Sequence, residues 1–264
     1  MAEHDSRRTG LARALSKLGY CSRSQAAKLI RAGSVTLNGA IRRDPETPCR
    51  IDHDRFEVDG HAVKQARRIY LMMNKPRGLV TTASDEKGRE TVYSILNPEE
   101  RSLSWIAPVG RLDKASEGLL LLTNDSEWGA RIATPETHLP KTYHVQIDAV
   151  VGYEEIQVIE RGVRVDGELL RAKRCRLLRS GEKNCWLAIT LDEGKNRQIR
   201  HLLAALDREV LRLIRVSIGP LQIGALGKRS YRHLTAQEKM ALDRALHGDR
   251  SRQSFDVDSS RSHI

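Results

Sequence analysis

One segment of the chain sets an aspartate beside an arginine, two glycines and an apolar run. It reads Gly110-Arg111-Leu112-Asp113 and, after Ser116 and Gly118, continues as four leucines at positions 119–122. A carboxylate at a sheet edge next to an arginine has an ionisation that its neighbours can tune, and glycine lets another molecule approach closely. The segment therefore predicts a charged group at the edge of an apolar pocket. A simple turn entering a buried strand has the same pattern, so further residues must distinguish the two.

A second segment, residues 141–145, places a tyrosine on an alternating strand. Lys141, Tyr143 and Val145 share one face of that strand because side chains alternate with a period of two. Tyr143 could stack on a base or a sugar ring, and its hydroxyl could relay a proton. Taken alone, this segment favours an ordinary half-buried strand tyrosine.

A third segment, residues 193–203, is a polar loop that turns into a helix. Arg197 and Arg200 lie three residues apart near the start of that helix, and Lys195 precedes them. Cations at a helix N-terminus oppose its dipole, so these arginines are expected to have a negatively charged partner. Either a phosphate or Asp113 would serve, and a basic surface turn is the alternative.

The composition favours a polyanionic partner. The chain has 264 residues, with 45 Lys and Arg against 34 Asp and Glu, and a formal charge of +11. This excess points to nucleic acid more than to a membrane, since the longest apolar run, 118–122, is far below the roughly 20 residues that span a bilayer. A signal-peptide core is not recognisable either, so we expect a cytoplasmic protein.

The cysteines and histidines do not indicate a metal site. The four cysteines, Cys21, Cys49, Cys175 and Cys185, are far apart, and none has a histidine at ligand spacing. The phosphate-binding glycine fingerprints are not recognisable. We predict reduced structural cysteines, no metal and no cofactor.

The N-terminal region predicts a small helix-helix-hairpin unit. Apolar spacing over residues 11–18 indicates one helix, and Ser22 with Gln25 forms a capping box for a second helix that stops at Gly33. Asn38-Gly39 between short apolar runs is a strong hairpin signal. The unit resembles the alpha-L RNA-binding motif, which implies that its basic residues contact RNA: Arg13, Lys17, Arg23, Lys28, Arg31, Arg42 and Arg43. A solvated basic surface is the alternative.

The remaining chain predicts an α+β catalytic domain with a mixed, mainly antiparallel sheet. From residue 69 strands and helices alternate without a fixed period, which argues against a repeat protein and a doubly wound sheet. We predict a disordered N-terminus at 1–9, the RNA-binding module at 10–63 and a basic linker at 64–68. The catalytic domain then occupies 69–246, and a disordered tail follows at 247–264.

Taken together, the three segments resemble the pseudouridine synthase family, specifically its RsuA-type branch of bacterial ribosomal RNA enzymes. The resemblance spans roughly residues 10–240. Besides the three segments in their order, it rests on the leucine run after the Asp113 loop, on the order of RNA-binding module and catalytic domain, on the turn Lys75-Pro76-Arg77-Gly78, and on a later strand with Leu213, Arg215, Ile218, Gly219 and Leu221. His201 and Leu202 depart from the basic residue and methionine of many relatives, and Glu117 adds a carboxylate at a variable position. These departures weaken any assignment of the target uridine.

The resemblance implies that the protein converts uridine in ribosomal RNA to pseudouridine. Asp113 would be the essential carboxylate, as nucleophile at C1′ or as base at C2′, with Arg200 paired to it and Tyr143 packed on the base. Leu112 and Ile218 would form the pocket walls, and Arg111 would fill the space that the flipped uridine leaves. Lys75, Lys195 and Arg197 complete the expected RNA contacts.

The expected partner is ribosomal RNA or a ribosome assembly intermediate, and a monomer is the default. We favour a large-subunit site mildly over a small-subunit site. Two other functions stay open from the sequence: a non-catalytic RNA-binding or ribosome-assembly protein, and an N-glycosylase that uses Asp113 and Glu117 as an acid and base pair.

Overall fold

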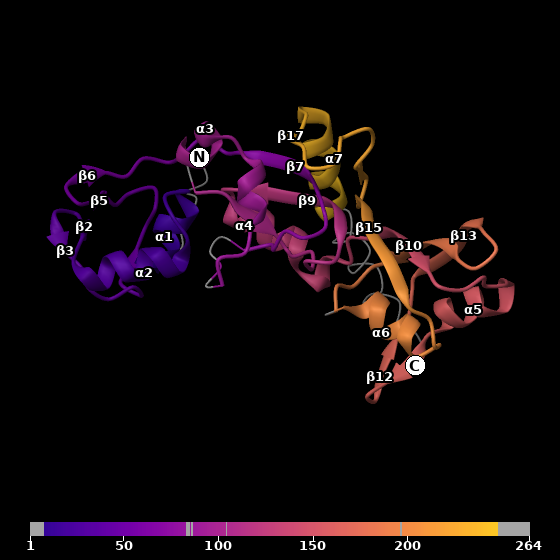
Figure 1. Ribbon diagram of the computed structural model, residues 1–264. Helices are drawn as coiled ribbons and strands as arrows, with labels where there is room; N and C mark the ends of the chain where they lie inside the picture. Colours follow the sequence, from indigo (N-terminus) through magenta and orange to yellow (C-terminus); the bar gives the residue numbers. More distant parts are fainter. Residues whose placement is uncertain (1–7, 83–84, 86, 104, 196, 248–264) are drawn as a thin grey trace, which may run out of the picture. The chain divides into compact units, whose positions relative to one another are not determined.

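The computed structural model describes residues 8–82, 85, 87–103, 105–195 and 197–247 (Figure 1). The termini for which we predict disorder lie almost entirely outside these residues. The chain forms two compact units. The first comprises Met1–Tyr70, Leu96–Ala107 and Leu122–Gly129, and the second comprises Leu71–Ile95, Pro108–Leu121 and Ala130–Ile264.

The first unit contains the predicted helix-helix-hairpin. Helix α1 spans Leu11–Lys17 and α2 spans Arg23–Ala32. Ser22 and Gln25 form the predicted capping box, and Gly33 ends α2 in the left-handed conformation with φ of 85°. Asn38 and Gly39 both have positive φ, as a tight hairpin turn requires.

The strands of this unit form small antiparallel sheets. Strands β2 (Val35–Leu37), β3 (Ala40–Ile41), β5 (Phe56–Val58) and β6 (His61–Ala62) pair in the order β3-β2-β5-β6, and β1 (Thr9–Gly10) pairs with β4 (Pro48–Cys49). Leu11, Leu15, Ile30 and Val35 are completely buried between the helices and the hairpin. This core buries the apolar stripes of both helices and leaves their arginines and Lys28 in solvent.

A mixed sheet dominates the second unit. Among the described residues its strands follow the order β13-β14-β10-β15-β9-β7-β17, with β16 on β15 and β8 on β9. Strand β14 is antiparallel to β13 and β10, β15 is antiparallel to β10 and β16, and β17 is antiparallel to β7, whereas β9 runs parallel to β15. The fold is therefore α+β, as the sequence predicts. The strand bounds are β7 Tyr70–Lys75, β8 Ala107–Val109, β9 Glu117–Thr123, β10 Lys141–Ile147, β13 Arg174–Ser180, β14 Cys185–Leu191, β15 Val210–Ile218, β16 Leu221–Gln222 and β17 Tyr231–His233.

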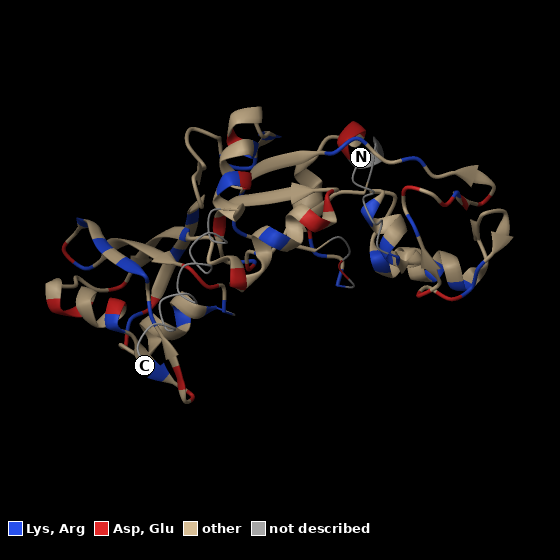
Figure 2. Ribbon diagram, turned by 180° about the vertical axis from the view of Figure 1, so that it is seen from behind, with Lys and Arg blue, Asp and Glu red and all other residues tan. Residues whose placement is uncertain are grey.

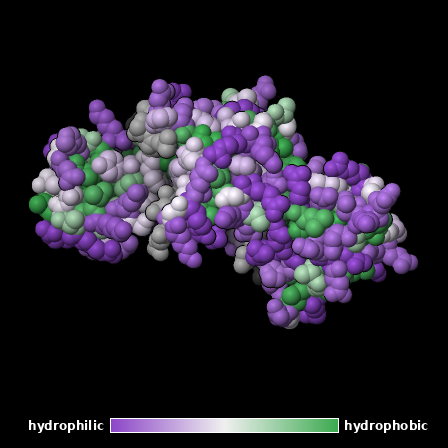
Figure 3. Space-filling model, in the orientation of Figure 1, coloured by the Kyte–Doolittle hydropathy of each residue, from purple (hydrophilic) through white to green (hydrophobic). Residues whose placement is uncertain are grey.

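Short helices and one further hairpin connect these strands. They are η1 (Val92–Ile95), α3 (Pro98–Leu103), α4 (Ser126–Ala133), η2 (Pro135–Thr137), α5 (Tyr153–Arg161), α6 (Gln198–Ala204), α7 (Ala236–His247), and the β11 (Val163–Val165) and β12 (Glu168–Leu170) pair. No helix of the described residues is long and apolar enough to cross a membrane. The face seen in Figure 3 is mostly hydrophilic, with apolar residues in separate patches.

One face of the sheet carries the core of the second unit. Val145, Leu187 and Ile189 alternate toward Ile159 of α5 and toward Ile199 and neighbouring residues of α6. Figure 1 shows these two helices beside strands β10, β13 and β15. The side chains that β10 and β15 place on this face at their other ends line the pocket described below.

Gly118 allows the parallel contact between β9 and β15. It pairs with Arg215, its φ is 100°, and a Cβ there would lie 2.2 Å from the Arg215 carbonyl oxygen. Only glycine fits this position. The predicted leucine run follows directly, and Leu119, Leu120, Leu121 and Leu122 are completely buried.

Candidate active site

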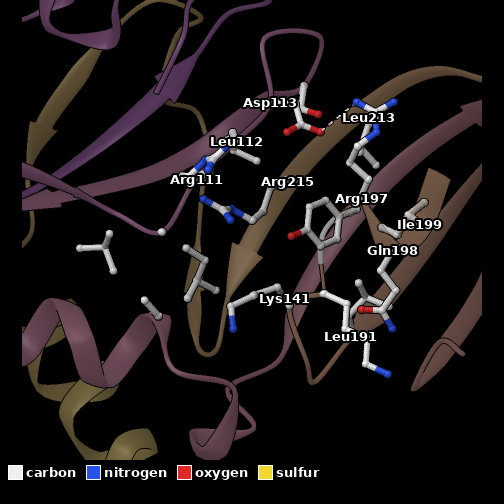
Figure 4. A pocket seen from close by; sticks show the side chains of 18 of the residues that line it. Arg111, Leu112, Asp113, Lys141, Leu191, Arg197, Gln198, Ile199, Leu213 and Arg215 are labelled. Carbon is white, nitrogen blue, oxygen red and sulfur yellow. Dashed lines mark ion pairs between the residues drawn. The ribbon is translucent and has the colours of Figure 1, made fainter. Parts of the chain in front are cut away.

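A pocket of about 460 Å³ opens on the sheet face near the Asp113 loop. Its walls come from that loop, from β10 and β15, and from the start of α6 (Figure 4). All of these segments belong to the second unit. The three chemically suggestive segments of the sequence therefore converge on a single cavity.

Asp113 lies at the rim of this pocket, partly exposed. Its side chain is 31% exposed, and its carboxylate Oδ2 lies 3.6 Å from Nη1 of Arg197. Figure 4 shows the two side chains facing each other. The loop turns back at once, because Ser116 N–H donates to the Asp113 carbonyl. The carboxylate thus keeps solvent and ligand access while a cation stabilises its charge.

Lys75 anchors the Asp113 loop through hydrogen bonds to its main-chain carbonyls. Its ammonium donates to the carbonyl oxygens of Pro76, Asp113 and Ser116 at 3.1, 3.0 and 2.8 Å, and the residue is completely buried. Burial lowers the pKa of Lys75 to about 8, although Asp113 and Glu117 act in the opposite direction. The RNA contact that we expect for Lys75 is wrong, because its side chain has no surface to offer. Its contribution is to position the loop.

The cation beside Asp113 differs from the one that the resemblance implies. Arg197 makes the ion pair, whereas Nη1 of Arg200 donates to the Val210 carbonyl at 3.2 Å. Arg197 precedes α6 in the left-handed conformation with φ of 51°, and its side chain makes no cap hydrogen bond to the helix. Burial lowers the pKa of Arg200, and the nearby Arg197 lowers it further, while Asp113 raises it. Arg200 is therefore close to the carboxylate without being its ion-pair partner.

The predicted apolar and aromatic residues line the same pocket. Leu112 and Ile218 are buried in its walls, and the partly buried Tyr143 of β10 lines it as well and packs against the core cluster that includes Ile199 of α6. Tyr143 is paired with Arg215 across the β10–β15 ladder. Arg111 is exposed at the rim. A planar ring that enters this cavity would find an aromatic side chain, aliphatic walls and a carboxylate.

Two buried cations in the pocket were not predicted as functional. Arg215 is only 4% exposed; its Nε donates to the Leu119 carbonyl at 2.7 Å, and its Nη2 has no hydrogen-bond partner among the described residues. Lys141 donates to the Leu139 carbonyl, and burial, with Arg215 as the next cause, lowers its pKa to about 8. Strand alternation could have found Lys141, because it shares a face with Tyr143. Arg215 is the cross-strand partner of Tyr143, a pairing that only the structure shows. An unpaired buried guanidinium nitrogen favours a ligand with hydrogen-bond acceptors.

Glu117 does not line this pocket. Its buried carboxylate pairs with Nε of Arg212 at 3.2 Å and with Nζ of Lys228 at 2.6 Å, and these partners lower its pKa even though burial, the largest single cause, raises it. Two cations occupy it fully. Glu117 therefore cannot serve as the second carboxylate that an N-glycosylase with an acid and base pair at Asp113 would need.

The basic residues of the N-terminal module are mostly in solvent. Arg13, Arg23, Lys28, Arg31, Arg42 and Arg43 are exposed. Lys17 is partly buried and pairs with Glu127 at 2.5 Å. In the second unit, Lys195 lines the pocket and pairs with Glu168 at 2.8 Å and Glu193 at 3.5 Å. The exposed arginines of the module are free to meet phosphates.

A small basic module and a sheet with a carboxylate and a tyrosine in its pocket are typical of RNA-modifying enzymes. Comparison with known proteins defines the class further. Residues 69–205 match the RNA pseudouridylate synthase family, and residues 9–55 match the S4 domain. The chain belongs to the RNA pseudouridylate synthase family, with an N-terminal S4 domain, and is an RNA pseudouridine synthase.

Relatives match over nearly their whole length. The chain is 34% identical to the uncharacterized RNA pseudouridine synthase YtzG of Bacillus subtilis, over 87% of this chain and 96% of the relative. It is 32% identical to the ribosomal large subunit pseudouridine synthase B of the same organism, over 93% of this chain and 99% of that protein. A crystal structure of a pseudouridylate synthase superposes with a TM-score of 0.62 at 29% identity, covering 89% of this chain and 99% of that one.

Proposed function

We propose that this enzyme isomerises one specific uridine in large-subunit ribosomal RNA to pseudouridine. The observation that carries the proposal is a single pocket that holds the Asp113–Arg197 pair together with the partly buried Tyr143. The resemblance to a ribosomal large subunit synthase over 93% of the chain supports ribosomal RNA as the substrate. The S4 domain supports binding to a structured RNA.

In the proposed reaction Asp113 acts on the ribose of the target nucleotide. The bond between N1 of uracil and C1′ breaks, the detached uracil turns, and C5 bonds to C1′. The proton on C5 leaves to solvent and N1 takes one up, so the product is an isomer of the substrate. Asp113 either attacks C1′ and is later displaced, or removes the proton at C2′ and later returns one.

The pocket residues explain how a detached base is held. Tyr143 offers a ring face for stacking and a hydroxyl for the proton transfer at C5. Leu112 and Ile218 exclude water, which would otherwise trap the sugar intermediate. The free Nη2 of Arg215 is a donor for a uracil carbonyl oxygen.

The target uridine must leave its stack to reach this pocket, which costs a few kcal/mol. Arg111, exposed at the rim, fills the vacated space in our account. Phosphate contacts by exposed arginines of the S4 domain offset part of that cost, and they make binding depend strongly on salt. The domain therefore controls affinity more than chemistry.

The test is nucleotide-resolution mapping of pseudouridine in total RNA from cells that lack the protein. We expect one large-subunit uridine to lose its mark, and wild-type protein but not Asp113→Asn to restore it. Loss of a small-subunit mark instead would refute the large-subunit assignment. Unchanged marks at every ribosomal position would refute ribosomal RNA as the substrate and favour a non-catalytic binding role.

A further inference from the structure

The sheet face opposite the pocket carries its own set of polar and basic side chains. On β10, Tyr143 and Val145 point toward the pocket and the core, so Thr142, His144 and Gln146 point the other way. These three residues are partly exposed, as are Ile214 and Val216 of β15. We call this surface the rear face of the sheet.

Three arginines of the edge strand β13 lie along the rear face. Arg174 pairs with Thr190, Arg176 with Ala188 and Arg179 with Trp186, and all three arginines are exposed. None of the three forms an ion pair within the described part of the chain. Figure 2, seen from behind, shows blue segments along these strands. Like charges on one strand repel, so a row of guanidinium groups without ion-pair partners in the described residues favours an anionic ligand.

Trp186 fixes two guanidinium groups on this face. The Cζ atoms of Arg179 and Arg212 lie 4.9 and 5.5 Å from its ring centroid, and the ring is only 8% exposed. Arg212 is also paired with the buried Glu117 at 3.2 Å. Cation–π contacts and an ion pair order these side chains before any ligand arrives, which lowers the entropic cost of binding.

Two adjoining hollows make the rear face continuous. One, of about 420 Å³, is lined by His144, Arg179, Trp186 and Arg212, among others. The other, of about 250 Å³, is lined by His144, Arg174 and Arg176 together with hydroxyl-bearing side chains. His144 lines both. Their shared wall makes a single basic strip across β13, β14, β10 and β15.

We propose that this strip binds the phosphodiester backbone of the RNA substrate at a segment other than the one that enters the pocket. The inference rests on the proposed function, because an RNA substrate supplies the polyanion. Guanidinium groups bind phosphate oxygens through two parallel hydrogen bonds, and hydroxyl groups such as that of Thr142 add donors. Since the strip and the pocket lie on opposite faces, only an RNA that extends around the sheet reaches both.

The proposal predicts that RNA length decides whether the strip matters. The test compares wild type with the double variant Arg174→Gln/Arg176→Gln, using a transcript of whole large-subunit ribosomal RNA and a short stem-loop around the mapped uridine. The matched control is Arg161→Gln/Arg171→Gln, which removes two exposed charges elsewhere in the same unit. All four arginines are exposed, so both double variants are expected to fold, and thermal unfolding checks this.

We expect the double variant at 174 and 176 to bind the long transcript about tenfold more weakly, with a shallower salt dependence by roughly 1–2 in the slope of log K against log salt. Binding of the stem-loop changes less than about twofold, and the control changes both less than about twofold. Equal binding of the long transcript by the two double variants would overturn the proposal. Failure of wild type to modify either RNA would instead overturn the proposed function.

Discussion

Lys75→Met tests the role of a buried lysine as the support of the Asp113 loop. The substitution keeps a flexible chain of similar length and removes the donor to three main-chain carbonyls. Each orphaned acceptor costs about 1–3 kcal/mol. The substitution also removes a buried charge, which stabilises the variant. Because the pKa of Lys75 is lowered from 10.5 to about 8, this stabilisation amounts to about 3 kcal/mol near neutral pH.

The balance is a loss of about 3 kcal/mol of unfolding free energy, or a fall in Tm of roughly 6–12 °C at this chain length. The assay is thermal unfolding at neutral pH, with Lys64→Met as the control because Lys64 is exposed. Activity should fall mainly in kcat, since the loop that carries Asp113 loses its anchor. A Tm and kcat equal to those of Lys64→Met would refute the reasoning.

The remaining predictions concern the site and the strand that supports it. Arg197→Gln removes the cation 3.6 Å from Asp113 and should lower kcat about tenfold with little effect on Tm. Arg200→Gln should instead mainly lower Tm, because Arg200 donates to the Val210 carbonyl. The opposite result would identify Arg200 as the partner of Asp113. Gly118→Ala brings a Cβ within 2.2 Å of the Arg215 carbonyl oxygen and should lower the unfolding free energy by more than about 3 kcal/mol. Gly167 also has a positive φ but has open space around it, so Gly167→Ala should lower it by only about 1–2 kcal/mol. Equal losses would refute the close approach at Gly118. Between pH 8 and 10.5 Lys75 binds fewer protons in the folded than in the unfolded protein, because burial lowers its pKa, so its contribution to the unfolding free energy rises with pH. In Lys75→Met the unfolding free energy should therefore rise less steeply over this window. Identical pH profiles for wild type and variant would contradict the lowered pKa.

Local sequence signals predict the N-terminal module well. The capping box at Ser22, the stop at Gly33 and the Asn38-Gly39 turn are all interactions within a few residues, and each is present in the structure. Such contacts depend on side-chain chemistry at fixed spacing, so a single sequence contains them. Strand order in the mixed sheet is different, because it depends on pairings between residues as far apart as Gly118 and Arg215.

In the candidate site, too, the sequence predicts the residues of local motifs but not the contacts between distant segments. The pocket is lined by four residues that the sequence motifs predict there: Leu112, Asp113, Tyr143 and Ile218. The ion pair of Asp113 is formed by Arg197, which precedes the helix in a left-handed conformation, and spacing along a helix cannot reveal this choice over Arg200.

Buried charge is the other feature that the sequence conceals. Lysine is almost always a surface residue, so a position such as Lys75 is expected to contact RNA. Its complete burial becomes visible only in the structure, where the carbonyls of Pro76 and of the Asp113–Ser116 turn converge on its ammonium. Arg215 is also buried, and its place in the pocket follows only from its pairing with Tyr143 on a strand far away in the sequence.

The most direct test of the central claim follows the fate of the hydrogen on C5 of uracil. Ribosomal RNA transcribed with uridine tritiated at C5 releases tritium when C5 bonds to C1′. Purified wild-type enzyme is expected to release tritium in proportion to the pseudouridine formed, and Asp113→Asn is expected to bind the RNA as tightly and release none. Release by Asp113→Asn at the wild-type rate would contradict the assignment of this pocket as the catalytic centre.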